Sequence, residues 1–102
     1  MILIQQTEHY ALWFAALRDR VARARSNIRI RRLSLGNAGD VQPVGGGVAE
    51  LRIDHGPGYR VYFVQRGAEI IVLLAGGDKG SQTQDIQTAK ALAVIVKEPP
   101  WP

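Results

Sequence analysis

The chain has 102 residues, of which 46% are apolar, and its formal net charge is +4 at pH 7. This length fits one domain over residues 1–102 with a single core, and the apolar share excludes wholesale disorder. The chain has no cysteine, which excludes a disulfide framework and thiolate metal sites. It also lacks an apolar run of membrane-spanning length and a signal-peptide pattern, so we expect a cytoplasmic protein without a membrane partner.

The first part of the chain predicts a short strand and two helices. Residues 2–4 form the strand, and Thr7 can cap the helix that follows. Helical spacing gives the first helix an apolar stripe of Tyr10, Trp13, Phe14 and Leu17. A second helix runs from about residue 19 into the low thirties, with a stripe of Leu17, Val21, Ala24 and Ile28. We expect the two helices to form a hairpin that turns these stripes onto one face of a sheet.

The second helix is rich in arginine. Only Asp19 opposes the seven arginines of this segment, which are Arg18, Arg20, Arg23, Arg25, Arg29, Arg31 and Arg32. Arg20, Arg23 and Arg31 lie mostly off the apolar stripe and are therefore available to a partner. Such a face attracts nucleic acid or an acidic protein. The alternative is a solvated helix face without a partner.

The middle of the chain predicts three strands. Residues 41–44 include Pro43 and predict an edge strand, which glycines 45–47 turn into the next one. Residues 48–53 and 59–64 alternate in polarity, so we expect them to pair as a hairpin closed by a five-residue loop.

The last part predicts a buried strand and a helix. Residues 70–75 are all apolar, as in a central strand buried on both faces. Ser81 and Gln84 form a capping-box pattern, and Pro99 and Pro100 end the helix. The stripe of this helix consists of Ile86, Ala89, Ala93 and Val96. The order βααββββα predicts an α+β fold, with two N-terminal helices packed on a small, mainly antiparallel sheet of four to five strands and a C-terminal helix.

The hairpin gathers cations on one face of this sheet. If Ile53 lies opposite Tyr59, then Arg52 faces Arg60 and Glu50 faces Tyr62, all on the face opposite Leu51 and Val61. Facing like charges require an anion, which Glu50 supplies in part and a bound phosphate can complete. Lys79 would emerge beside the start of the last helix, whose N-terminus near Gln82 also suits an anion. The alternative is an exposed face whose cations pair with Glu50, Asp54 and Asp78.

Two segments carry a family resemblance, namely Gly58-Tyr59-Arg60-Val61-Tyr62 and, after it, Gly76-Gly77-Asp78-Lys79. In this order they closely resemble the RelE/ParE superfamily, and more narrowly its HigB-like branch of addiction module killer proteins. The resemblance runs from about residue 2 to residue 96. It implies the toxin of a type II toxin–antitoxin pair, a ribosome-dependent mRNA endoribonuclease that inhibits translation and needs no metal or other cofactor.

The resemblance also implies roles for single residues. By position, Arg60 matches the best-preserved arginine of the family, Arg52 a basic strand residue, and Lys79 the basic residue after the last strand. Because arginine stays protonated, Arg52 and Arg60 would stabilise the phosphate, while Lys79 and Tyr62 are candidates for proton transfer. Arg52, Arg60, Lys79 and Gln82 would bind the RNA. The Tyr or His that several members carry in the last helix is absent, so the general acid and base stay unassigned.

Two other functions stay open. A ParE-like protein would poison DNA gyrase, and a catalytically inactive relative would only bind its antitoxin. All three readings imply a small cognate antitoxin with a helix-turn-helix domain, which alone contacts operator DNA. We expect it to dock on Arg20, Arg23 and Arg31, whereas the nuclease would meet mRNA in the ribosomal A site.

Overall fold

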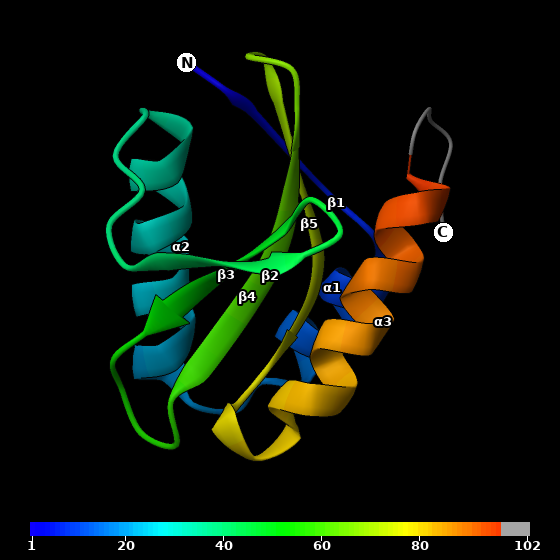
Figure 1. Cartoon of the computed structure of the whole chain (residues 1–102). Coiled ribbons are helices and arrows are strands. Elements are labelled where there is room, and N and C mark those ends of the chain that lie inside the picture. The colour runs from blue at the N-terminus through cyan, green and yellow to red at the C-terminus, as the bar shows by residue number, and fades with distance from the viewer. Residues whose placement is uncertain (97–102) are drawn as a thin grey trace.

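The computed structural model describes residues 1–96 and has the predicted order of elements (Figure 1). The elements are β1 (Leu3–Gln6), α1 (Glu8–Ala16), α2 (Arg20–Ser34), β2 (Val41–Gly45), β3 (Val48–Ile53), β4 (Tyr59–Arg66), β5 (Ile70–Gly77), the single 3-10 turn η1 (Lys79–Ser81) and α3 (Gln82–Ile95). The fold is therefore α+β, with a five-stranded sheet and three helices. The predicted helix end at Pro99 and Pro100 lies outside the described residues.

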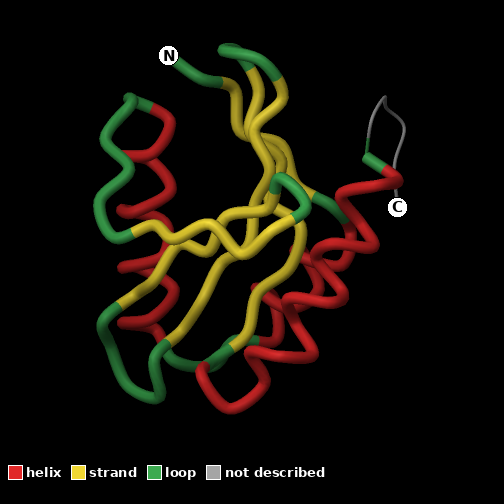
Figure 2. The backbone as a smooth tube through the Cα atoms, viewed as in Figure 1, coloured by secondary structure: helices red, strands yellow, loops and turns green. Residues whose placement is uncertain are grey.

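The sheet separates two helical layers. Its strand order is β1-β5-β4-β3-β2, in which only the β1–β5 pair is parallel. The helices α1 and α2 pack on one face of the sheet, where Tyr10 and Leu33 share a core, and α3 packs on the other face. Figures 1 and 2 show α2 and α3 on opposite sides of the sheet. The Pro43-containing strand β2 forms one edge of the sheet, as predicted.

Each face of the sheet has its own core. On the α3 side, Val48, Tyr62 and Val64 pack with Ala89, Ala93 and Val96. On the other side, Leu51, Val61 and Phe63 pack with Tyr10 and Leu33. The central strand β5 serves both cores, with Ile71 and Leu73 on one side and Val72 and Leu74 on the other. The predicted burial of this strand on both faces is confirmed.

Thr7 and Asp19 set the positions of the first two helices. The Thr7 hydroxyl accepts the Tyr10 N–H at 3.1 Å and donates to the Leu74 carbonyl oxygen at 2.7 Å. This confirms the predicted cap and also ties the start of α1 to β5. Asp19 caps α2 by accepting the Ala22 N–H at 3.0 Å.

The predicted apolar stripe of the second helix is wrong about which face is buried. Val21 and Ile28 are about half exposed, whereas Ala22, Ser26 and Leu33 are buried. Small residues let α2 approach the sheet closely, and the Ser26 hydroxyl remains satisfied because it donates to the Ala22 carbonyl oxygen. Arg29 holds this face in place by donating to the Arg52 carbonyl oxygen. Close packing of small residues and the hydrogen bond of Arg29 therefore decide which face of α2 is buried, and the spacing of the large apolar residues does not.

The predicted capping box at Ser81 and Gln84 is also wrong. The box is formed one turn earlier, where the Asp78 carboxylate accepts the N–H groups of Gly80 and Ser81. Ser81 makes no side-chain cap for α3, because its hydroxyl donates to Asp85 instead. The shift inserts the turn η1 between β5 and α3, and Lys79 lies at its start.

Candidate functional site

The β3–β4 hairpin has the register that the sequence predicts. Arg52 pairs with Arg60, Glu50 with Tyr62, and Ile53 with Tyr59. Because side chains alternate along a strand, Glu50, Arg52, Arg60 and Tyr62 share one face of the hairpin. Two arginines therefore lie directly opposite each other on neighbouring strands, a destabilising arrangement unless an anion compensates it.

Glu50 is this anion. Its side chain is fully buried, and its Oε1 accepts a hydrogen bond from Arg52 Nε at 2.9 Å. Its Oε2 accepts a second bond from the side-chain amide of Gln82, the first residue of α3, at 2.7 Å. Arg60 Nε lies 3.9 Å from Oε1. The carboxylate thus connects both arginines to α3.

Glu50 stays ionised at neutral pH. Burial alone would raise its pKa, but the hydrogen bonds from Arg52 and Gln82 outweigh burial and hold the pKa below its usual value. A permanent negative charge therefore lies beneath the two guanidinium groups. In turn, the Glu50 carboxylate raises the pKa of Arg52, mainly through their hydrogen bond.

The three predicted cations meet in one cavity of about 420 Å³ at the end of this hairpin. Its wall consists of Asp40, Arg52, Ile53, Asp54, Gly56, Pro57, Gly58, Arg60 and Lys79. The Arg52 side chain is 39% exposed and the Arg60 side chain 14% exposed, while Lys79 is exposed. Lys79 also comes close to the loop, because a Cβ on Gly58 would lie 3.5 Å from its own.

Arg60 lines this cavity, and its contact with Glu50 is longer than that of Arg52. Its Nε is buried and has no hydrogen-bond partner within residues 1–96, since Glu50 lies beyond hydrogen-bond distance. Among the described ion pairs, Glu50 is the only acid that contacts Arg52 or Arg60. The alternative in which Asp54 and Asp78 also pair with these cations is therefore wrong for the described residues. Two guanidinium groups that share one carboxylate keep a net positive charge in the cavity wall, which is suited to bind an anionic oxygen.

Tyr62 and Gln82 lie behind the cavity wall. Tyr62 is fully buried, and its hydroxyl is near Glu50 but not in hydrogen-bonding geometry. Its pKa is raised, first by burial and then by the Glu50 charge, so it stays protonated. Gln82 is half-buried and donates to Glu50. Neither side chain is part of the cavity wall, unlike Arg52, Arg60 and Lys79.

The sequence did not point to Asp40 as a wall residue. Asp40 precedes β2, and its carbonyl oxygen accepts the Arg52 N–H at 3.0 Å. This bond brings a carboxylate from a distant part of the chain beside the hairpin. The pairing of β2 with β3 was the one available signal, because it places the residue before β2 near the end of β3.

The loop after β3 is fastened to the second helix. His55 Nε2 lies 3.0 Å from Asp19 Oδ2, and the His55 ring stacks on Tyr59. The pKa of Asp19 is lowered, first by the Ala22 N–H and also by His55. His9 lies on α1, so the two histidines come from separate elements. Within residues 1–96 no group of metal-ligating side chains is placed to hold an ion, and no helix is long and apolar enough to cross a membrane.

The predicted partner-binding arginines divide into two kinds. Arg20 and Arg31 are exposed and make no side-chain hydrogen bond or ion pair within the described part of the chain. Arg23 instead packs its guanidinium over Phe14, 5.0 Å from the ring centroid, and donates to the Leu17 carbonyl oxygen. Arg23 thus helps to hold α2 against α1.

Residues 13–95 match the family described as phage derived protein Gp49-like (DUF891). The chain belongs to this family. It is a RelE-like family associated with the toxins of toxin–antitoxin systems, and membership implies a cognate antitoxin partner.

A relative in Haemophilus influenzae, described as an uncharacterized protein, is 46% identical over 92 residues. The match covers 90% of this chain and 93% of the relative. No solved structure matches the chain.

Proposed function

We propose that this protein is the toxin of a type II toxin–antitoxin pair and acts as a HigB-like, ribosome-dependent mRNA endoribonuclease. The observation that carries the proposal is the meeting of Arg52, Arg60 and Lys79 in one cavity, above the buried carboxylate of Glu50. Membership in a toxin-associated family supports it. The protein would act in the cytoplasm, on mRNA held in the ribosomal A site.

In this proposal the cavity supplies the groups that metal-free RNA cleavage requires. The 2′-oxygen of the RNA loses its proton and attacks the adjacent phosphorus, and the 5′-oxygen leaves with a proton. Arg52 and Arg60 would stabilise the negative charge that develops on the phosphate oxygens. Lys79 would protonate the leaving 5′-oxygen, and Asp40 and Asp54 are the carboxylates in the wall that can accept the 2′-proton.

Glu50, Gln82 and Tyr62 would support this site from behind. Glu50 neutralises part of the charge of Arg52 and Arg60, which lets two arginines remain together when no RNA is bound. Gln82 fixes the position of Glu50 through its hydrogen bond, and the buried Tyr62 forms part of the α3-side packing. In this proposal Tyr62 positions the site and does not transfer the proton itself.

A gyrase poison is the second candidate function. It is favoured by the exposed arginine-rich surface of α2, since such a toxin acts by binding a protein. A catalytically inactive module that only binds its antitoxin would use the same surface. These two readings leave the cavity without a function, and the nuclease reading explains it.

Expression without an antitoxin, followed by pulse labelling, separates the three functions. The nuclease predicts that protein synthesis stops first and that messages acquire new internal ends. Lys79→Ala should abolish both effects, whereas Lys90→Ala, an exposed lysine on α3, should not. Early loss of DNA synthesis with intact protein synthesis would favour gyrase, and undisturbed growth would favour the inactive module.

A further inference from the structure

The second helix presents an apolar stripe to solvent. Val21, Ile28 and the C-cap residue Leu35 recur every seven residues and are 49%, 50% and 59% exposed. Exposed Ala24 lies among them, on the side of the helix opposite the buried Ala22, Ser26 and Leu33. Single exposed apolar residues are common, but a row of them along one helix indicates a binding surface. We call this row, with its bordering arginines, the α2 outer face.

Arginines border the row on both sides. At 100° per residue, Arg20 and Arg31 lie along one side of the apolar row and Arg25 and Arg32 along the other. Within residues 1–96, Arg20, Arg31 and Arg32 have no side-chain hydrogen bond or ion pair, and Arg25 donates only to the Asp54 carbonyl oxygen at 3.0 Å. Within residues 1–96 these guanidinium groups have no carboxylate partner, so they are available to the acidic groups of a partner.

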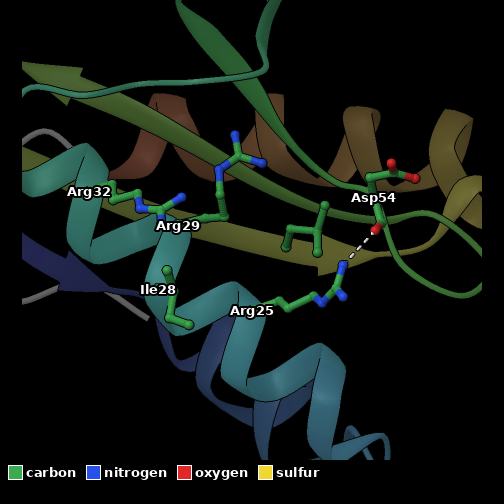
Figure 3. A pocket seen from close by; sticks show the side chains of 6 residues that line it. Arg25, Ile28, Arg29, Arg32 and Asp54 are labelled. Carbon is green, nitrogen blue, oxygen red and sulfur yellow. Dashed lines mark hydrogen bonds between the residues drawn. The ribbon is translucent and has the colours of Figure 1, made fainter.

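A pocket of about 300 Å³ opens beside the row, between α2 and the end of β3 (Figure 3). Ile28 and Ile53 provide its apolar surface, and Arg25, Arg29 and Arg32 its charged wall. Arg29 is held in place by hydrogen bonds to the carbonyl oxygens of Ala38, Asp40 and Arg52. The pocket therefore has one fixed wall and room for an inserted side chain.

We propose that the α2 outer face docks an acidic amphipathic helix of a partner protein. The apolar side chains of that helix would cover Val21, Ile28 and Leu35, with one inserted beside Ile53, and its carboxylates would pair with the bordering arginines. A second copy of this chain does not fit, because it would bring arginines against arginines. An RNA backbone offers nothing to cover the apolar row.

The inference deepens the proposed function, because in a toxin this partner would be the antitoxin. The docking chemistry itself depends only on the α2 outer face and does not require nuclease activity. It also refines the predicted antitoxin site. Arg20 and Arg31 belong to the border of the face, whereas Arg23 is turned toward Phe14.

The test measures binding of the full chain to a synthetic helical peptide with leucines at heptad spacing and glutamates beside them. A peptide of the same residues in scrambled order and an RNA oligonucleotide of equal charge are the comparison probes. We expect the ordered peptide to bind most tightly, with an affinity that falls as salt is added. Ile28→Ser and Arg32→Gln should each weaken it by about tenfold or more, the loss of one anchoring contact.

Two matched variants control for unspecific effects. Leu12→Ser removes another exposed apolar side chain, from α1, and Lys90→Gln removes another exposed cation, from α3; both should bind as the parent does. Four results would each overturn the docking inference. They are no binding of the ordered peptide, equal binding of the scrambled peptide, tighter binding of the RNA, and unchanged peptide affinity in folded Ile28→Ser. Peptide binding by a parent chain that cleaves no message would overturn the nuclease and leave the docking face intact.

Discussion

The protein carries two arginine-rich regions that differ in what lies beneath the charges. In the cavity, Arg52 and Arg60 stand over the buried carboxylate of Glu50, which fixes their positions. On the α2 outer face, Arg20, Arg31 and Arg32 have no acidic partner within residues 1–96 and lie beside exposed apolar residues. An arginine held by a buried carboxylate suits chemistry on a phosphate, whereas an arginine without an acidic partner beside apolar surface suits docking of a protein.

The largest expected effect comes from removing the carboxylate beneath the cavity. Glu50→Ala leaves the half-buried Arg60 and the Gln82 amide without their acidic partner. Breaking a buried ion pair in this way typically costs about 3–5 kcal/mol of unfolding free energy. Urea unfolding measures it, and Glu69→Ala, which removes an exposed glutamate, is the control. A loss no larger than that of Glu69→Ala would show that Glu50 does not hold the site together.

Removal of Arg60 should affect activity more than stability. Arg60→Ala deletes a preorganised donor to the phosphate, an effect typically worth about 100- to 1000-fold in rate. The variant should stay folded, because the facing Arg52 loses a like-charged neighbour. Mapping of new message ends in a translation extract measures the cleavage rate. Binding of the acidic peptide to the α2 outer face should not change.

Acid should weaken the cavity region. The pKa of Glu50 is lower in the folded protein than its ordinary value of 4.5, so its contribution to stability is present above that value. It is lost as the pH falls through the folded pKa, where Glu50 takes up a proton. Urea unfolding from pH 7 to pH 3 should show a fall in unfolding free energy that is smaller in Glu50→Gln. Equal falls in both proteins would assign the acid sensitivity to other carboxylates.

The smallest effect concerns the border of the α2 outer face. Arg31 is exposed, so its charge should act mainly on how fast the acidic helix associates. Arg31→Glu should slow association at low salt, and the difference from the parent should fade at high salt. Stopped-flow mixing with the acidic peptide measures the association rates of the parent and of Arg31→Glu at low and at high salt. A difference that persists at high salt would mean that Arg31 makes a buried contact.

The sequence predicted the hairpin better than the helix. Strand alternation has a period of two, so one opposed pair, Ile53 with Tyr59, fixed the facing of Arg52 and Arg60. Apolar residues do recur at helical spacing on α2, but small residues and the hydrogen bond from Arg29 to the Arg52 carbonyl oxygen decide which face of the helix is buried. The contact of Gln82 with Glu50 joins residues 32 positions apart, and no local pattern reports such a contact.

The most direct test measures message cleavage and acidic-peptide binding on the same two variants, Arg60→Ala and Ile28→Ser. We expect opposite losses in the two folded variants: Arg60→Ala loses cleavage and keeps peptide binding, while Ile28→Ser keeps cleavage and loses peptide binding. If each variant loses both properties, or if Arg60→Ala cleaves message as fast as the parent, then the division of the protein into a catalytic cavity and a separate docking face is wrong.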